Sequence, residues 1–329
     1  MKVLVTGGAG YIGSHVVRQL AAAGHDIVVF DNLSTGYRWA VTAGELVEAD
    51  LADEDAIEAV FSAHKFEAVL HFAANIVVPE SVANPLKYYS NNTRNTLNLL
   101  KAVERHQVPY MVFSSTAAVY GMPEETVLTE DLPLAPINPY GASKMMSERM
   151  MMDLAAASNL NYVILRYFNV AGANPEGLLG QATPEATHLI KVACECVTGQ
   201  RDGMSVFGTD YETRDGTCIR DYIHVEDLAK AHVMALDYMV GGGESQVLNC
   251  GYGRGFTVRE VIDVVKAESG VDFPVTETGR RAGDPAALMA DNTRIKNVLG
   301  WQPDYDDLNT IVRTALAWEA VWQKKKASR

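Results

Sequence analysis

The chain has 329 residues, of which 48% are apolar and 21% are charged, and its formal net charge at pH 7 is −13. A chain of this length can bury a large core, which indicates one big α/β unit or two domains. The acidic balance argues against general binding to nucleic acids or anionic membranes, because basic patches carry both interactions.

Strand-like apolar runs alternate with helical stretches through the first half of the chain. This alternation predicts βαβ units and a parallel sheet with right-handed crossovers, that is, a Rossmann-like doubly wound α/β fold. Strands are predicted at residues 3–6, 27–30, 45–48, 68–71, 110–113 and 162–166. Helices are predicted at residues 12–23, 53–63, 81–106 and 139–158.

Two parts of the chain break this rhythm. Residues 121–138 contain three prolines and are predicted to form a long loop, a kind of loop that is often functional. From about residue 170 the pattern becomes irregular and rich in glycine. We therefore expect a Rossmann domain over residues 1–169 and a smaller mixed α/β domain over residues 170–329. A segment near 218–240 is expected to pack back on the first domain.

The first predicted strand runs directly into a glycine-spaced loop, Gly7-x-x-Gly10-x-x-Gly13, which opens the first predicted helix. Glycines here let backbone amides approach a pyrophosphate, and the helix N-terminus adds N–H donors and the positive end of its dipole. Asp31 ends the second strand, 18 residues after Gly13. A carboxylate there can accept both ribose hydroxyls and would repel a 2′-phosphate, so NAD is the predicted cofactor rather than NADP.

A tyrosine and a lysine share one face of the helix predicted at 139–158. Asn138 can cap this helix and Pro139 suits its first turn. Tyr140 and Lys144 then lie four residues apart on the same side. A lysine cation near a phenol favours the phenolate and lowers its pKa toward that of a general base. Surface Tyr–Lys pairs are common, so this spacing gains weight only in combination with other motifs.

The stretch at residues 114–121 reads SSTAAVYG and places three hydroxyls directly after a predicted strand. Together with the glycine loop and the Tyr–Lys pair, it resembles the extended branch of the short-chain dehydrogenase/reductase superfamily over nearly the whole chain. The resemblance implies that Tyr140 is the catalytic acid/base and that Lys144 is its partner. It also implies that Thr116 is the assisting hydroxyl, at a place where serine is frequent.

Four later stretches narrow the resemblance to the UDP-glucose 4-epimerase family: LRYFN, VFGTDY, RDYIHVEDL and RRAGD. The resemblance implies reversible NAD-dependent epimerisation at C4 of UDP-hexoses, such as UDP-galactose to UDP-glucose, through a transient 4-keto sugar. It also implies a cytoplasmic homodimer that is paired through the helices at 81–106 and 139–158. A UDP-sugar is the implied partner, with no nucleic acid and no membrane.

The resemblance also assigns residues to the two ligands. Arg220 and Arg281 are expected to meet the diphosphate, as suits an arginine fork, and would let an acidic protein hold an anionic substrate. The implied cofactor residues are Gly7, Gly10, Tyr11, Ile12, Gly13, Asp31, Asn32, Asp50, Leu51, Phe72, Ala73, Ala74, Asn91, Ser114, Tyr140, Lys144 and Tyr167. The implied substrate residues are Thr116, Tyr140, Asn169, His188, Leu189, Phe207, Arg220, Val258, Arg281, Asp284 and Leu288.

Three positions depart from the family pattern. Ile76 stands where many relatives carry a lysine that reaches the cofactor, so NAD is expected to be held less tightly or in another way. His188 stands where an asparagine often contacts the substrate. Leu288 occupies the position associated with room for an N-acetyl group, and a bulky leucine there favours the plain hexoses.

Several alternatives stay open. The substrate could be a UDP-pentose or a UDP-N-acetylhexosamine. A sugar-nucleotide 4,6-dehydratase needs an acid and a base directly after the threonine, where this chain has Ala117 and Ala118. A UDP-glucuronate decarboxylase fits the RDYIHVEDL and RRAGD segments less well. A non-catalytic NAD-binding module would tend to lose the Tyr–Lys pair.

The remaining signals are weaker. The spacing of the four cysteines fits no zinc site, so no metal is expected, and reduced thiols in a cytosolic protein are the favoured interpretation. The chain begins with a predicted strand rather than a signal peptide, and no apolar run approaches the roughly 18 residues that a membrane span requires. A methionine cluster suits either the dimer surface or the core: Met145, Met146, Met150, Met151 and Met152.

Overall fold

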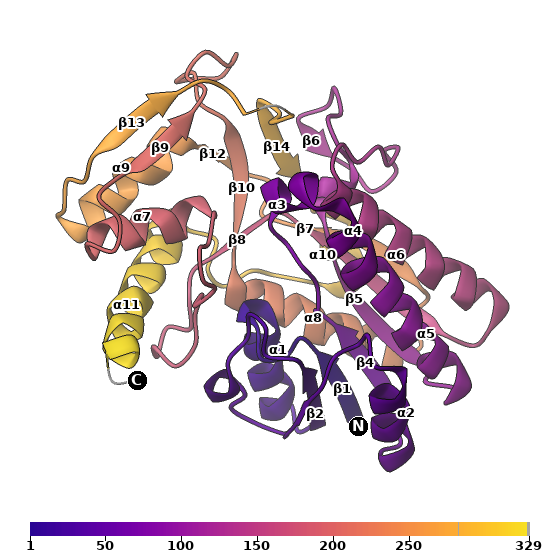
Figure 1. Cartoon of the computed structure of the whole chain (residues 1–329). Coiled ribbons are helices and arrows are strands. Elements are labelled where there is room, and N and C mark those ends of the chain that lie inside the picture. Colours follow the sequence, from indigo (N-terminus) through magenta and orange to yellow (C-terminus); the bar gives the residue numbers. More distant parts are fainter. Residues whose placement is uncertain (282, 328–329) are drawn as a thin grey trace.

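The computed structural model describes residues 1–281 and 283–327, and Figure 1 shows their arrangement. The central sheet contains β1 (Lys2–Thr6), β2 (Asp26–Asp31), β3 (Glu45–Glu48), β4 (Ala68–His71), β5 (Tyr110–Thr116), β7 (Asn161–Tyr167) and β11 (Gln246–Cys250). Its strand order is β11-β7-β5-β4-β1-β2-β3, and all neighbours run parallel. The predicted doubly wound α/β fold is therefore confirmed.

The helices are α1 (Tyr11–Ala22), α2 (Glu54–Ala63), α3 (Val78–Ala83), α4 (Pro85–Tyr88), α5 (Asn95–Arg105), α6 (Pro139–Ala157), α7 (Leu189–Val197), α8 (Val225–Val240), α9 (Val258–Ser269), α10 (Thr293–Leu299) and α11 (Leu308–Ala327). Helices cover both faces of the central sheet. Along β1, Val3 and Val5 join the core cluster that includes α1 and α8, whereas Leu4 joins the cluster of α2, α5 and α6. Successive strand residues point to opposite faces, so an apolar strand such as β1 serves both cores.

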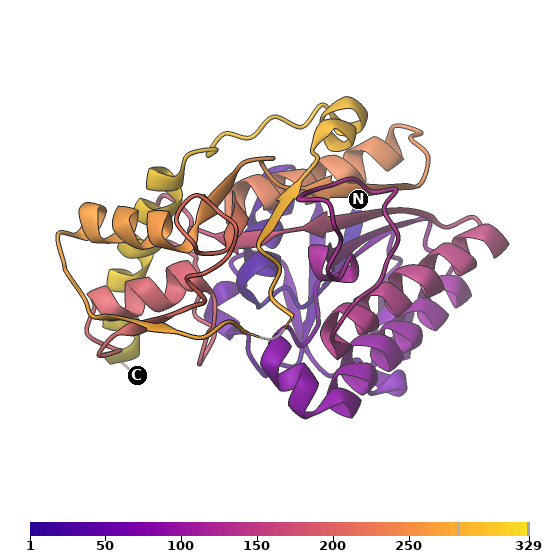
Figure 2. The same ribbon diagram turned by 90° about the horizontal axis from the view of Figure 1, so that it is seen from above.

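Two smaller sheets stand beside the central one. They use β6 (Val127–Leu128), β8 (Asn169–Ala171), β9 (Met204–Phe207), β10 (Ile219–His224), β12 (Gly255–Thr257), β13 (Val275–Thr278) and β14 (Ala287–Ala290). One has the order β12-β10-β14-β6, with β8 also paired to β10, and the other is β13-β9. Figure 2 shows α7, α9 and α11 with β9 and β13 at one end of the molecule and α5 and α6 at the other.

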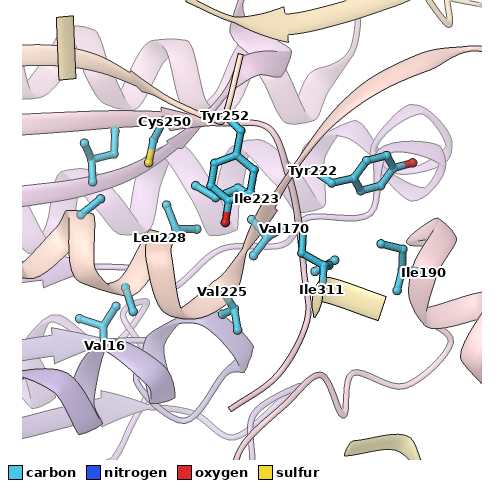
Figure 3. Packing of buried hydrophobic residues seen from close by; sticks show 14 of the residues in the cluster. Val16, Val170, Ile190, Tyr222, Ile223, Val225, Leu228, Cys250, Tyr252 and Ile311 are labelled. Carbon is cyan, nitrogen blue, oxygen red and sulfur yellow. The ribbon is translucent and has the colours of Figure 1, made fainter. Parts of the chain in front are cut away.

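The chain returns to the central sheet after residue 170. β11 pairs with β7 as an outer strand, and α8 lies against α1, where the Gln19 amide donates to the Glu226 carboxylate at 2.7 Å. Figure 3 shows Val16 of α1 and Leu228 of α8 in the same apolar cluster as Ile223 of β10. The division of the chain at residue 169 stays a prediction, because β11 and α8 belong with the first part in space.

The single helix predicted at 81–106 is wrong. The segment forms α3, α4, a π-helical turn (Tyr89–Arg94) and then α5. Asn84 precedes Pro85, and a residue before proline is pushed out of the helical region. Its φ and ψ are −137° and 70°, and its side chain caps the next helix by accepting from the Lys87 amide.

The long loop predicted at 121–138 contains a short strand, β6, which pairs with β14. It therefore ties the central sheet to the smaller one. Gly121 starts the loop with a φ of +73°, and a Cβ there would lie 1.9 Å from the Ala135 carbonyl oxygen. Only glycine fits that turn. Within the described residues, no helix is long and apolar enough to cross a membrane.

The unpredicted strand β11 is expected to carry much of the stability. Leu248 is fully buried in it, so Leu248→Ala should lower the free energy of unfolding by about 2–5 kcal/mol, measured by chemical denaturation. Leu178→Ala is the control, because Leu178 is 46% exposed and its truncation should change stability by less than about 0.5 kcal/mol. Equal effects of the two changes would contradict the role given to β11.

Candidate functional site

A cavity of about 1590 Å³ opens at the carboxyl end of β1. There the strand order reverses, because β2 lies on one side of β1 and β4 lies on the other. Doubly wound sheets bind ligands at this switch point. Single-ligand pockets measure roughly 300–1,000 Å³, so this cavity has room for two ligands side by side.

The turn from β1 into α1 brings backbone to the cavity. Gly7 has a φ of +72°, and a Cβ there would lie 2.5 Å from the Ala73 amide nitrogen. A Cβ at Gly13 would lie 2.3 Å from the Gly7 carbonyl oxygen. Gly10 is the N-cap of α1 and, as a glycine, has no side chain that could cap the helix. The backbone N–H groups of the first turn are therefore left for a ligand. This cradle fits the pyrophosphate of a dinucleotide.

Carboxylates gather at the ends of β2 and β3. Asp31 accepts from the amides of Ala9 and Leu33 at 3.0 and 2.8 Å, and burial raises the pKa of its carboxyl. Each oxygen keeps a second lone pair for a ribose hydroxyl. The Asn32 side-chain amide donates to the Asp50 carboxylate at 2.7 Å and so connects the end of β2 with the residues after β3. The arrangement leaves room for the adenosine ribose of NAD, and the contact of that ribose with Asp31 stays a prediction.

Tyr140 enters the cavity from the first turn of α6, where Asn138 caps the helix by accepting from the Gly141 amide at 2.9 Å. Burial raises the pKa of the Tyr140 phenol to about 12, and hydrogen bonding to the Thr116 hydroxyl acts in the opposite direction. Thr116 itself is held at the end of β5, because its hydroxyl oxygen accepts from the Ala118 amide at 3.1 Å.

Lys144 lies one helical turn further along α6 and is buried. Its ammonium donates to the Ser114 carbonyl at 2.8 Å and sits 4.7 Å from the centre of the Phe113 ring. Burial lowers the pKa of the ammonium to about 7, and the negative charge of Glu148 acts in the opposite direction. Among the described residues that line the cavity, Lys144 does not appear; it stands behind Tyr140.

The expectation that Lys144 lowers the pKa of Tyr140 is not met in this structure. The pKa of Tyr140 is raised, and the influences on it are burial and Thr116. Lys144 turns its charge to the carbonyl of Ser114 instead. Burial therefore dominates both titrations when the protein is alone, since it disfavours the charged form of each group.

A buried ion pair between α6 and β7 supports the region around Thr116 and Tyr140. Arg166 donates to Glu148 at 2.6 Å, with both side chains almost fully buried. Ser115, next to Thr116, also donates to Glu148. Ser114 donates to the Tyr167 hydroxyl at 2.9 Å. The catalytic candidates are thereby fixed to β5, α6 and β7 at once.

Cationic side chains line the other end of the cavity. The Arg281 guanidinium lies 3.6 Å from the centre of the Phe207 ring, and Arg220 forms an ion pair with Asp284. At the start of α7, the Gln181 amide lies 2.9 Å from Nδ1 of His188, and burial lowers the pKa of that imidazole. This end can take an anionic ligand through its two arginines.

The cavity brings together the residues that the sequence assigned to two ligands. The lining includes Gly7, Gly10, Tyr11, Ile12, Gly13, Asp31, Asn32, Asp50, Leu51, Phe72, Ala73, Ala74, Asn91, Ser114, Thr116, Tyr140, Tyr167, Asn169, His188, Leu189, Phe207, Arg220, Val258, Arg281, Asp284 and Leu288. Their individual roles stay predictions. Ile76 also lines the cavity and is 41% exposed.

Sequence reasoning missed other parts of the lining. Ser34 and Thr35 follow Asp31 closely, and that position was the available signal. Glu80 and Lys87 are an ion pair at the mouth. Gln181 and residues 183–187 have no periodic pattern, so only the folded chain brings them to the cavity.

The arrangement fits a dinucleotide and a second, anionic ligand on either side of the buried Thr116 and Tyr140. The chain belongs to the NAD dependent epimerase/dehydratase family, whose model matches residues 3–251. It is 57% identical to a UDP-glucose 4-epimerase of Azospirillum brasilense, over 97% of this chain and 92% of the relative. The family resemblance in the sequence is confirmed.

Solved structures agree with this assignment. The UDP-Glc/GlcNAc 4-epimerase from Campylobacter jejuni is 52% identical, with a TM-score of 0.86, over 97% of this chain and 99% of that one. The UDP-glucose 4-epimerase from Brucella ovis in complex with NAD is 46% identical, with a TM-score of 0.93, over 96% of this chain and 97% of that one.

The glycine cradle gives a direct test of the dinucleotide end. Gly13→Ala should weaken NAD binding about tenfold or more, because relieving its contact with the Gly7 carbonyl costs more than about 1.4 kcal/mol. Bound NAD is measured after gel filtration. Gly279→Ala is the control, since no described atom lies within 4 Å of a Cβ there. Wild-type NAD content in Gly13→Ala would contradict the cradle.

Proposed function

We propose that this chain is an NAD-dependent UDP-hexose 4-epimerase that interconverts UDP-galactose and UDP-glucose. The observation that carries the proposal is one cavity that joins the glycine cradle, the Thr116–Tyr140 corner and the Arg220–Arg281 end. The family membership and the relatives named UDP-glucose 4-epimerase support the same reaction.

Tyr140 is the acid/base in this proposal. Its phenolate takes the proton of the C4 hydroxyl and later returns a proton to the same oxygen, while Thr116 hydrogen-bonds to the phenol and orients it. Bound NAD would supply the hydride acceptor and donor for C4, and its positive charge would favour the phenolate. A high pKa of Tyr140 in the protein alone is consistent with a base that forms only in the complete site.

Lys144 acts through position rather than through contact with the sugar. Its ammonium donates to the Ser114 carbonyl within β5 and adds a buried positive charge one helical turn from Tyr140. Glu148 pairs with Arg166, and its negative charge also favours the Lys144 ammonium. Since burial lowers the pKa of Lys144 to about 7, its charge changes with pH near neutrality.

The substrate must be held firmly at one end and loosely at the other. Arg220 and Arg281 anchor the diphosphate, with Phe207 under the second arginine. The 4-keto sugar then turns about its link to the diphosphate and presents its opposite face to the cofactor. A protein that bound the sugar as firmly as the nucleotide would prevent this turn.

Two small residues direct the outcome. Ala117 and Ala118 line the cavity directly after Thr116 and cannot transfer protons, so elimination of water from the 4-keto sugar has no acid or base at that place. Return of the hydride is then the productive exit. The two alanines therefore disfavour a dehydratase.

The N-acetylated substrates are the second candidate. The Campylobacter jejuni relative is named for both UDP-Glc and GlcNAc. In this chain Leu288 lines the cavity and packs with the cluster of Val119, Tyr120 and Leu128. A leucine there occupies space that an N-acetyl group would need, so we favour the plain hexoses.

A homodimer in the cytoplasm completes the proposal. Helices α5 and α6 lie side by side on an outer face (Figures 1 and 2), where Leu97 and Met146 are 41% and 40% exposed. Met151 is fully buried and Met145, Met150 and Met152 are partly buried, whereas Met146 is exposed, so most of the cluster serves the core. All four cysteines are buried free thiols, as suits a reducing compartment.

The base is tested by Tyr140→Phe with UDP-galactose as substrate and no added reductant. UDP-glucose formation should fall by about 10²–10⁴-fold, while bound NAD and UDP affinity stay near wild type. Tyr162→Phe, on the far end of β7, is the matched control and should keep full activity. Near-normal turnover by Tyr140→Phe would refute the assignment of the base.

The same assay separates the alternatives. Incubation with UDP-N-acetylglucosamine should give little product. Efficient conversion of that sugar, with none of UDP-galactose, would overturn the interpretation of Leu288. Formation of a 4-keto-6-deoxy sugar would overturn the epimerase proposal.

The dimer surface is tested by the double change Leu97→Arg and Met146→Arg. Two charges on the paired helices should give a monomer near 35.8 kDa by light scattering, where the wild type gives twice that mass. Val240→Arg is the control, because Val240 is 46% exposed on α8, away from this face. A wild type that is already monomeric would rule out the dimer.

A further inference from the structure

Four aromatic side chains from two distant parts of the chain form one cluster, which we call the aromatic clamp: Tyr37, Trp39, Trp318 and Trp322. The Trp39 ring centre lies 5.7 Å from those of Trp318 and Trp322. Tyr37 lies 5.5 Å from Trp39 and 5.3 Å from Trp322. Trp318 and Trp322 stack at 6.4 Å. Three of the four tryptophans of the chain belong to this cluster.

The first half of the clamp belongs to the loop at residues 32–40, which lines the cofactor end of the cavity through Ser34 and Thr35. The same loop is pinned to the glycine turn, because the Tyr37 amide donates to the Ala9 carbonyl at 3.0 Å. A Cβ at Gly36 would lie 2.8 Å from that carbonyl. The loop is therefore fixed both to the clamp and to the glycine turn.

The second half of the clamp belongs to α11. Trp318 and Trp322 are each 2% exposed. In Figure 1, α11 lies beside the segment between β8 and α7. Trp318 donates its indole N–H to the Gln181 carbonyl at 3.1 Å, and the Tyr37 hydroxyl donates to the Ala182 carbonyl at 3.3 Å. Both walls of the cavity are therefore held by one cluster.

A lysine of α11 packs over the outer rings of the clamp, and an ion pair joins α11 to α7. The Lys325 ammonium lies 4.3 Å from the Trp39 ring centre and 5.1 Å from that of Trp318, which favours the cation over the ring faces. Deeper in, Lys191 of α7 forms a buried ion pair with Glu319 of α11 at 2.5 Å. Because α11 is fixed to α7 in this way, it is a firm support for the loop.

We propose that the aromatic clamp retains NAD by holding the loop at 32–40 closed over the cofactor end of the cavity. The cofactor cannot leave until this loop moves, and the loop cannot move without separating Trp39 from Trp318 and Trp322. Many relatives carry a lysine that reaches the cofactor where this chain has the apolar Ile76. The clamp supplies the missing retention of NAD through apolar contacts. Tyr37, Trp39 and Trp322 are positioning residues, because they act through the loop.

This inference rests on the proposed NAD site but not on the epimerase reaction. It is tested by the rate at which purified, NAD-loaded protein loses its cofactor to an excess of competing dehydrogenase, read by absorbance. Trp39→Leu and Trp322→Leu should each release NAD about tenfold faster or more, since each removes two or more ring contacts. Trp39→Phe should restore a rate near wild type.

Trp301→Phe is the matched control. Trp301 is fully buried beside Tyr252, outside the clamp, so its change should lower the melting temperature without faster release. If Trp39→Leu and Trp322→Leu both released NAD at the wild-type rate, the inference would be wrong and the proposed function would stand. If Trp301→Phe released NAD as fast as the clamp variants do, the inference would also be wrong, because faster release would then follow from general instability of the protein. A wild type that never binds NAD would overturn the proposed function and the inference together.

Discussion

The turn between β1 and α1 is the constraint on which the rest of the structure depends. Gly7, Gly13 and Ala73 bring three stretches of backbone within van der Waals contact, and no side chain can enter between them. This contact sets the start of α1 at the point where the strand order reverses. The cavity, its row of carboxylates and the corner at Tyr140 are all arranged around that point.

Electrostatics in the corner follow from burial more than from sequence spacing. The spacing of Tyr140 and Lys144 correctly placed both on one face of α6. It could not reveal that the lysine would bond the carbonyl of Ser114, or that Glu148 and Arg166 would form a compensated pair beneath it. A pKa depends on the surrounding atoms of several elements, and a four-residue spacing describes only one of them.

The parts that sequence predicted well are those with local causes. Apolar runs predicted six strands of the central sheet, and the glycine spacing predicted the cradle, because each pattern is read within a few residues. β11 was missed, since its sequence QVLNC has a weak apolar pattern and its partner β7 lies some eighty residues earlier. The break at Asn84 has a local signal in Pro85, which the long helical pattern concealed. Contacts such as Trp39 with Trp322 have no local signal at all.

The late position of β11 also has a consequence for how the chain comes to be folded. Six parallel strands are complete by residue 167, but β7 remains an unpaired edge until residues 246–250 are made. At usual rates of protein synthesis, about 5–20 residues per second, that edge is uncovered for several seconds on each ribosome. Exposed strand edges invite pairing with other chains, so a nascent chain that lacks residues 246–250 is more exposed to such pairing than the finished one.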